Sequence, residues 1–482
     1  MVFADSPKGG RSEESLVLTR EETPTLHKAS DKEFNEFIAA KADNGQLMER
    51  ITAEVNLQVA LTKVVQNRGA PGVDGQSVKE VEQNHETLVP LLRKELLAGN
   101  YQPGDVRRVW LPKPGGGQRG LGIPNVIDRW VQQAVLQVLE PIYDPTFHDS
   151  SHGFRRGRGA QTAIAQARGH LQAGLTTIVD IDLAKFFDRV NHQRLLAKLS
   201  ERIQDKRVLV LIGRMLKARV VMPDGTSVAT EEGTPQGGPL SPLLSNVVLN
   251  ELDSELERRR LRFVRYADDC NIFVASLRAG NRVMKSISDF LEKRLRLFVN
   301  TEKSAVRKPN QVHFLGFRFS RNSEKGWLVY LSHKAENRIE DRLKEMTPRT
   351  WGQSLAFCLK GLNTYIQGWG AYFRICDEEA TNSWKAIDAH VRRRVRAIVI
   401  RQQKRPRFLF RHLVRNGACE GSAAKTAWSS RGPWHKSARF GTHKAYNLAW
   451  FKENLKSLVG EWVKHNLPAP AVASETQLTF AL

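Results

Sequence analysis

The sequence has little cysteine and no long apolar segment, and both shortages exclude whole classes of protein. The four cysteines in 482 residues are scattered, with no CxxC pair and no histidine at zinc-finger spacing; they are Cys270, Cys358, Cys376 and Cys419. Neither a disulfide framework nor a structural zinc site is indicated, and buried thiols are expected. No apolar run approaches the roughly 20 residues that a membrane-spanning helix needs.

The start of the chain also lacks the features of a targeting signal. Residues 1–24 have no apolar core and mix acidic with basic side chains, so they fit neither a secretory signal nor an acidic-poor transit peptide. A protein that stays in the cytoplasm, with no membrane contact, is expected. Residues 1–44 are polar, which predicts a disordered leader in which only Lys32 to Ala42 could form a helix.

Acidic residues are scarce relative to basic ones. Lysine and arginine total 74 against 51 acidic residues, a formal charge of +23 that exceeds what solubility requires and indicates a polyanionic partner. Residues 385–450 contain 16 basic residues and only two acidic ones, Asp388 and Glu420, and the aromatic residues interleaved with them include Trp428, Trp434, Phe440 and Trp450. The pattern favours a nucleic-acid groove and a nucleoid-associated location, although any single arginine could be an ordinary solvated charge.

The length predicts two to four domains, and the periodicity changes along the chain. Residues 45–99 have helical spacing, and residues 106–123 form a hairpin around a glycine-rich turn, with Lys113 and Arg119 at its neck. Helices and strands then alternate irregularly to about residue 319, which predicts an α+β fold. Long helical segments follow from about residue 332 to residue 462.

Two adjacent acids lie between two strand-like runs at residues 263–274. Asp268 and Asp269 would stand at the tip of a hairpin, where like charges so close raise one another's pKa unless a cation neutralises them. An Asx-type turn is the alternative explanation. A second acidic element lies at residues 178–182, an apolar strand in which Asp180 and Asp182 share one face, so strand alternation cannot choose between them.

Three carboxylates that converge from two strand segments supply the oxygen ligands that magnesium prefers. Two such ions can activate a primer hydroxyl and stabilise the leaving pyrophosphate of an in-line displacement. The residue pattern therefore indicates template-directed nucleotidyl transfer, provided that the acids meet in space.

At this point the sequence resembles a family, the group II intron-encoded reverse transcriptases, often called intron maturases. The resemblance spans about Arg68 to Trp462, and the order and spacing of its motifs are specific. The matching segments are Tyr266-Ala267-Asp268-Asp269 for the Y-x-D-D box, residues 182–188 for the D-x4-F-D box, residues 233–242 for the P-Q-G box, Phe314-Leu315-Gly316-Phe317 for the primer-grip turn and residues 361–373 for the maturase thumb.

The resemblance implies a right-hand polymerase that copies RNA into DNA with two Mg2+ ions and deoxynucleoside triphosphates. Its parts would be residues 45–170 for the fingers with an N-terminal helical extension, 171–330 for a palm with an antiparallel sheet, 331–415 for an all-helical thumb (maturase domain X), 416–466 for a basic DNA- or RNA-binding domain and 467–482 for a tail. The implied partners are an RNA template, group II intron RNA above all, and a DNA or RNA primer.

Site residues follow from the same resemblance. The spacing to Phe187 and Asp188 selects Asp182, which with Asp268 and Asp269 would bind the metals. The other implied contacts are Lys113 and Arg119 to the incoming triphosphate, Phe187 as a gate against a ribose 2′-hydroxyl, Gln236 and Gly237 to template and nucleotide, Lys303 near the leaving phosphate, and Arg392, Arg393, Arg394 and Arg401 to nucleic acid. The ordinary alternatives stay open: a core phenylalanine, a glycine-rich helix start and surface charges.

No paired-cysteine HNH nuclease segment follows the basic region, so target cleavage is not expected. The main hypothesis is an RNA-directed DNA polymerase that also assists intron splicing and mobility. The alternatives are a non-catalytic RNA-binding splicing factor, a reverse transcriptase recruited to phage defence or DNA repair, and a nucleotide cyclase on a similar palm. The oligomeric state stays open, with a homodimer as one option.

Overall fold

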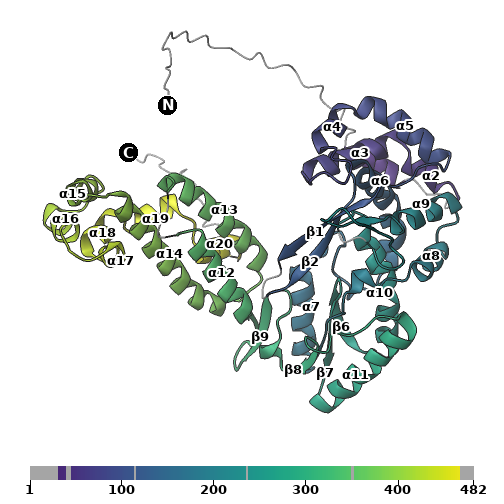
Figure 1. The fold of residues 1–482 in the computed structure, drawn as a ribbon. Coiled ribbons are helices and arrows are strands. Elements are labelled where there is room, and N and C mark those ends of the chain that lie inside the picture. Colours follow the sequence, from purple (N-terminus) through teal and green to yellow (C-terminus); the bar gives the residue numbers. More distant parts are fainter. Residues whose placement is uncertain (1–30, 40–44, 113–115, 235–236, 349–351, 467–482) are drawn as a thin grey trace, which may run out of the picture. The chain divides into compact units, whose positions relative to one another are not determined.

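The computed structural model describes residues 31–39, 45–112, 116–234, 237–348 and 352–466 (Figure 1). These residues form two compact units. The first unit contains the described residues up to Ile142 together with His192–Ser241. The second contains Tyr143–Asn191 and the chain from Pro242 onward. The polypeptide therefore leaves the first unit, returns to it and leaves it again.

The first unit combines helices with a four-stranded sheet of order β2-β1-β4-β5. β1 and β2 form the expected hairpin, paired from Arg107↔Ile123 to Pro112↔Gln118, while β1 pairs with β4 in parallel. The elements are α1 (Asp31–Ala39), α2 (Leu47–Ile51), α3 (Glu54–Gln66), α4 (Val78–Gln83), α5 (His85–Leu97), β1 (Val106–Pro112), β2 (Gln118–Ile123), α6 (Val126–Tyr143), α8 (His192–Ser200), α9 (Lys206–Leu216), β4 (Val220–Val221) and β5 (Ser227–Val228).

Helix α6 is largely buried against α3, which explains its apolar spacing. The indole nitrogen of Trp130 donates to the Leu57 carbonyl at 2.7 Å, and the Gln137 amide donates to the side chain of Asn56 at 2.8 Å. These bonds satisfy polar groups that would otherwise be costly in an apolar interior.

The second unit is built around an antiparallel sheet of order β6-β7-β3-β8. Four of the five residues of β3 are buried, and α11 packs on β3 and β8 while α7 packs on β6 (Figure 1). The elements are α7 (Ala160–Gln172), β3 (Thr177–Ile181), α10 (Ser241–Arg258), β6 (Arg262–Tyr266), β7 (Asp269–Val274), α11 (Leu277–Phe290), a π-helix (Leu291–Leu295) and β8 (Ala305–Arg307).

A two-stranded hairpin leads from this sheet into helices that continue the same hydrophobic core. Serine caps mark the starts of α12 and α13, since Ser332 and Ser354 each accept a bond from a backbone N–H three residues later. The elements are β9 (Phe317–Asn322), β10 (Gly326–Leu331), α12 (His333–Glu345), α13 (Leu355–Phe373), α14 (Thr381–Gln402), α15 (Pro406–Arg415), α16 (Glu420–Ala427), α17 (Pro433–Lys436), α18 (Phe440–Ala445), α19 (Leu448–Asn454) and α20 (Leu458–Asn466).

The predicted fold class is confirmed: mixed sheets and helices come first, and past Leu331 the described residues form helices only. In the leader, α1 takes most of the segment expected to be helical, while residues 1–30 and 40–44 lie outside the described residues. One prediction was wrong: Cys419 is exposed, because it lies before the first turn of α16 rather than on a core-facing position, whereas the other three cysteines are buried. No helix in the described ranges is both long and apolar enough to cross a bilayer.

Candidate active site

The antiparallel ladder between β3 and β7 brings the predicted acids together. Ile181 pairs with Cys270 and Asp180 with Asn271, so the next step of the same register places Asp182 opposite Asp269. Asp268 follows at the β6–β7 turn, where Tyr266 pairs with Asp269. Acids that are far apart in the chain therefore meet at one end of one sheet.

The turn that carries Asp268 has an unusual backbone. Ala267 has φ +56°, a left-handed conformation that costs a non-glycine residue about 1 kcal/mol or more. Gly153 lies directly against this turn, since a Cβ added to it would come within 2.4 Å of the Ala267 nitrogen. The surrounding protein therefore holds the turn in this conformation.

Asp269 is largely buried and lies near three other carboxylates. Burial raises its pKa most, and the charges of Asp268, Asp182 and Asp180 raise it further, to about 7, while Lys303 opposes the shift. Carboxylates this close to one another are difficult to ionise at the same time. A divalent cation would stabilise their ionised forms, so the group fits a cationic ligand. The donor set therefore fits hard divalent ions.

Lys303 and its neighbours lie against Asp182. The Lys303 ammonium is 3.5 Å from Asp182 Oδ2, and the lysine side chain is 63% exposed. The Asp182 backbone N–H donates to Ser304 Oγ at 2.9 Å, and the Asn300 N–H donates to the Asp182 carbonyl at 2.8 Å. Ser304 was not predicted; its only sequence signal was its position beside Lys303.

Asp180 occupies a different environment from Asp182 although both lie on one strand face. Its carboxylate is 3.7 Å from the Arg307 guanidinium, and burial raises its pKa to about 6. Its cross-strand partner Asn271 is buried, and neither polar atom of the Asn271 side chain has a hydrogen-bond partner. Asp180 is thus paired with the Arg307 guanidinium, whereas the carboxylate of Asp182 lies among the acids that raise the pKa of Asp269.

Among the described residues, no three His, Cys, Asp or Glu side chains converge closely enough to hold a metal ion alone. The acids share one end of the sheet without closing a cage. Magnesium completes its octahedron with water and substrate phosphates, so a polymerase supplies only a few protein ligands for each ion. Mutual repulsion also separates carboxylates that have no cation between them.

Phe187 lies just beyond Asp182, in the 3-10 turn Phe186–Asp188. Phe186 is buried, and Phe187 is half-buried with its ring edge-on to that of Phe186, 5.2 Å between centroids. Of the two adjacent phenylalanines, Phe186 therefore serves the core, and Phe187 keeps part of its ring exposed.

The primer-grip-like segment forms a tight turn under helix α13. Leu315 and Gly316 both have positive φ, at +53° and +89°, while Phe314 and Phe317 exchange backbone hydrogen bonds. The Tyr372 hydroxyl donates to the Leu315 carbonyl at 3.0 Å, and its ring stacks on Phe317 at 5.8 Å. A residue of the predicted thumb thus holds this turn.

The remaining nucleotide-binding predictions fall in the first unit. Arg119 is exposed on β2, whereas Lys113 and Gln236 lie outside the described residues. Gly237 has φ +131°, and a Cβ there would come within 2.4 Å of the Gly122 carbonyl oxygen. The close approach of the Gly122 carbonyl on the β1–β2 hairpin is therefore enough to explain why residue 237 is a glycine, without any contact to a nucleotide.

The arginines predicted to bind nucleic acid differ in their surroundings on α14. Arg401 is exposed, and Arg392 is half-buried. Arg393 stacks on Trp434 at 4.1 Å, while Arg394 donates to Thr347 Oγ1 and to the carbonyls of Thr347 and Lys344. Arg401 is the most accessible of the four, and Arg394 is occupied within the protein.

The aromatic residues of the basic region divide in the same way. Trp428, Trp434 and Phe440 are exposed, with Lys444 over the Phe440 ring at 5.2 Å. Trp450 is half-buried and lies edge-on to Tyr446 and Phe451. Exposed rings beside cations are typical of single-stranded nucleic-acid binding.

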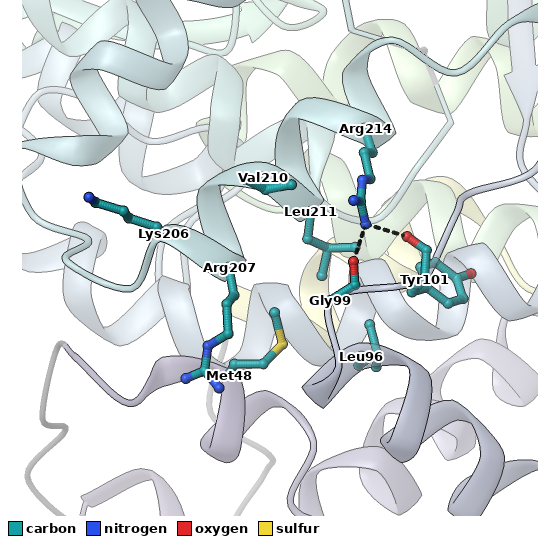
Figure 2. A pocket seen from close by; sticks show the side chains of 9 residues that line it. All are labelled: Met48, Leu96, Gly99, Tyr101, Lys206, Arg207, Val210, Leu211 and Arg214. Carbon is teal, nitrogen blue, oxygen red and sulfur yellow. Dashed lines mark hydrogen bonds between the residues drawn. The ribbon is translucent and has the colours of Figure 1, made fainter.

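A cavity of about 190 Å³ in the first unit looked like a second candidate site, with Met48, Leu96 and Leu211 in its lining (Figure 2). The Arg214 guanidinium at its edge donates to the Gly99 and Tyr101 carbonyls, as the dashed lines in Figure 2 show. The Arg207 guanidinium is bonded to Glu49 and Asp205. Both guanidinium groups bond α9 to residues of α2 or just after α5, so the two cations at this cavity already have partners within the protein.

Two family models match the chain in the regions just described. The model described as reverse transcriptase (RNA-dependent DNA polymerase) matches residues 111–319, and the model described as group II intron, maturase-specific domain, matches residues 336–417. The first match begins near the end of β1 and includes β2, the acids and the tight turn. The second begins in α12 and ends just beyond α15.

Curated relatives agree with these matches. Protein YkfC of Escherichia coli K12 is 32% identical over 355 residues, covering 65% of this chain and 91% of YkfC. The group II intron-encoded protein LtrA of Lactococcus lactis is 35% identical over 207 residues, covering 43% of this chain and 32% of LtrA. The chain thus aligns with nearly all of YkfC but only a third of LtrA.

Solved structures give weaker likenesses. A chain of the partial Cas6-RT-Cas1–Cas2 complex is 23% identical with a TM-score of 0.33, covering 51% of this chain and 42% of that one. An apo telomerase from Candida tropicalis is 14% identical with a TM-score of 0.36, covering 47% and 53%. Both scores are too low to support a functional comparison. The two family models and the near-complete match to YkfC, by contrast, show that the chain belongs to the group II intron reverse transcriptase and maturase family.

Proposed function

We propose that this chain copies an RNA template into DNA by two-metal-ion nucleotidyl transfer, with Asp182, Asp268 and Asp269 as the metal ligands. The chain has a reverse transcriptase domain, and that family implies a divalent-metal polymerase. The observation that supports the residue assignment is the β3–β7 register. Its last pair is Ile181 with Cys270, so Asp182 and Asp269 are the next residues at that end of the two strands, beside the turn of Asp268.

Two Mg2+ ions, when bound, would activate the primer 3′-hydroxyl and stabilise the leaving pyrophosphate. The chain's own groups prepare the site. Asp269 is poised to lose its proton near neutral pH, because burial and three neighbouring carboxylates raise its pKa to about 7. Lys303, beside Asp182, would place an ammonium near the departing phosphate as an acid or a balancing charge.

Nucleotide contacts complete the proposal. Arg119 would bind the triphosphate, bidentately because of its planar guanidinium, together with Lys113. The exposed part of the Phe187 ring would exclude a ribose 2′-hydroxyl, and Gln236 with Gly237 would contact template and nucleotide. Deoxynucleoside triphosphates are thus the expected substrates.

The C-terminal half would bind RNA and assist splicing and mobility. The maturase-specific domain implies binding of intron RNA. We assign the thumb to residues 331–415 and a basic nucleic-acid-binding domain to residues 416–466. Phosphate contacts from Arg392, Arg393 and Arg401 and stacking on Trp428 and Phe440 would bind the RNA largely by shape and charge.

Primer extension on an RNA template, with deoxynucleotides and magnesium, tests the proposal. Loss of an outer-shell partner of a metal ligand typically lowers activity by up to about 100-fold. Asp268→Ala removes a proposed ligand itself, so its activity should fall by more than that. RNA binding should stay at the wild-type level. Asp289→Ala, at an exposed position on α11, is the matched control and should extend normally.

Two outcomes would contradict the proposal in different ways. Wild-type extension by Asp268→Ala would overturn the site assignment. RNA binding without any extension by the wild-type protein would support a non-catalytic splicing factor instead.

A further inference from the structure

A completely buried arginine lies directly before the turn that carries the acids. Arg265 on β6 and its ion-pair partner Asp253 on α10 are both 0% exposed, with Nη2 of Arg265 2.6 Å from Asp253 Oδ2. A buried guanidinium needs an acceptor for each of its five N–H groups, since an unpaired one is costly.

All five N–H groups of Arg265 have an acceptor. Nε and Nη2 donate to the two oxygens of Asp253 at 2.8 and 2.6 Å. The second N–H of Nη2 donates to Ser151 Oγ at 2.7 Å, and Nη1 donates to Asn246 Oδ1 at 3.0 Å. The fifth donor, also on Nη1, reaches the carbonyl oxygen of Ala267 at 2.9 Å.

The hydrogen bond to the Ala267 carbonyl connects Arg265 to the candidate active site. This carbonyl belongs to the peptide that joins Ala267 to Asp268, and Ala267 is the residue with φ +56°. The side chain of Arg265 therefore spans the turn and fixes the orientation of the peptide from which Asp268 starts. A lysine could balance the charge of Asp253, but its single nitrogen lacks the planar fork that reaches both groups.

The backbone of residues 150–153 closes the other side of the same arrangement. The Arg265 N–H donates to the Ser150 carbonyl at 2.8 Å, and the His152 N–H donates to the Arg265 carbonyl at 2.9 Å. Asn246 accepts from Arg265 and also donates to the Gly153 carbonyl at 2.9 Å, while Gly153 touches the Ala267 nitrogen. Three separate chain segments thus converge on a turn of two residues.

We propose that Arg265 is a positioning residue for the polymerase reaction, which fixes the turn of Asp268 and Asp269 in the geometry that binds divalent ions. The inference rests on the proposed function, because it assumes that these acids are the ligands. Groups that orient metal ligands typically change metal affinity or activity about 10- to 100-fold when they are removed.

The test compares Arg265→Lys with Ser151→Ala. Arg265→Lys keeps the charge and loses the bond to Ala267, whereas Ser151→Ala removes another bond of the same guanidinium and leaves that bond intact. We expect Arg265→Lys to raise the Mg2+ concentration for half-maximal extension by about tenfold or more and to lower kcat, with the KM for deoxynucleotide little changed. Ser151→Ala should lower the unfolding temperature and keep the wild-type Mg2+ dependence.

Binding of Mn2+ to each protein, followed by electron paramagnetic resonance without substrate, separates this inference from the proposed function. Arg265→Lys should bind Mn2+ more weakly than the wild type even if no extension is seen. If Arg265→Lys shows no cooperative unfolding, Asn246→Ala replaces it. Unlike Ser151, Asn246 accepts from Nη1, the nitrogen that also donates to the Ala267 carbonyl, and it donates to the Gly153 carbonyl beside the turn. Its removal therefore loosens the turn while Arg265 keeps its ion pair with Asp253. Wild-type Mn2+ affinity in the folded variant would overturn the proposal.

Discussion

At the scale of single residues, neighbours rather than residue type decide what each acid can do. Asp180 and Asp182 share a strand face, yet Asp180 is beside Arg307, and Asp182 lies beyond the last β3–β7 pair, where its charge raises the pKa of Asp269. Sequence spacing selected Asp182, but the cation beside Asp180 could not be predicted, because Arg307 reaches it from another strand. Arg265 was missed for the same reason: its acceptors Asp253 and Ser151 are 12 and 114 residues away.

The raised pKa of Asp269 predicts how stability depends on pH. Burial and nearby carboxylates raise this pKa from 3.8 to about 7, so the stabilising contribution of Asp269 is complete below about pH 4 and is lost as pH rises through 7. Without divalent ions, the unfolding temperature should fall between about pH 4 and about pH 7, and that of Asp269→Asn should fall less steeply. Asp180 and Asp128, with pKa values near 6, contribute in the same direction in both proteins.

Saturating Mg2+ should reduce the difference between these two proteins, because it stabilises the ionised carboxylate only where Asp269 is present. Calorimetry across this pH range provides the measurement. Parallel pH profiles of wild type and Asp269→Asn in the metal-free state would contradict the expectation.

The half-buried ring of Phe187 predicts sugar selectivity. Phe187→Ala should incorporate ribonucleotides more readily, because the side chain proposed to exclude the 2′-hydroxyl becomes small, while Phe187→Tyr keeps the ring and should stay selective. Single-nucleotide incorporation with matched ribo- and deoxynucleotides gives the ratio of kcat/KM. An unchanged ratio in Phe187→Ala would assign the ring to the core beside Phe186 instead.

At the scale of elements, strands and hairpins were the most predictable features. Apolar and β-branched runs predicted β3, β6 and β7, and the glycine-rich turn predicted the β1–β2 hairpin. Charge, in contrast, did not show which arginines of α14 face solvent: Arg394 bonds to the end of α12, and Arg401 is exposed. A helix places neighbouring basic residues on different faces, so a run of arginines predicts a charge and not a contact.

The contact between α13 and the turn of Leu315 predicts an effect on primer use. Tyr372→Phe keeps the ring stack and loses the hydroxyl bond to Leu315, worth about 1 kcal/mol, so the positive-φ turn should be less well fixed. The KM for primer–template should rise several-fold, with a smaller effect on kcat. Tyr365→Phe, on the same helix, is the control and should match the wild type; equal kinetics of both variants would contradict this role.

At the scale of the whole molecule, the charge of +23 makes RNA binding depend on salt. Each phosphate contact to a single strand contributes about 0.7 to the slope of log affinity against log salt. Arg401→Gln should therefore weaken binding and lower the magnitude of the slope by about 0.7. Filter binding of a single-stranded RNA across several salt concentrations provides the measurement.

Arg394→Gln is the matched control on the same helix. Its guanidinium bonds to Thr347 and Lys344, so the change should lower the unfolding temperature and leave the salt slope unaltered. If Arg394→Gln lowered the magnitude of the salt slope and Arg401→Gln left it unchanged, the assignment of the two arginines would be reversed.

The two compact units are interleaved along the chain, and this order governs how they can form during synthesis. His192–Ser241 supplies α8, α9, β4 and β5 to the first unit, so a nascent chain that ends at Ile142 lacks half of the strands of that unit's sheet. Tyr143–Asn191, with β3 and its acid-bearing end, must likewise wait for β7 to emerge from the ribosome. Neither unit can be separated by a single cut in the gene, and a split version of the protein would need both fragments to fold together.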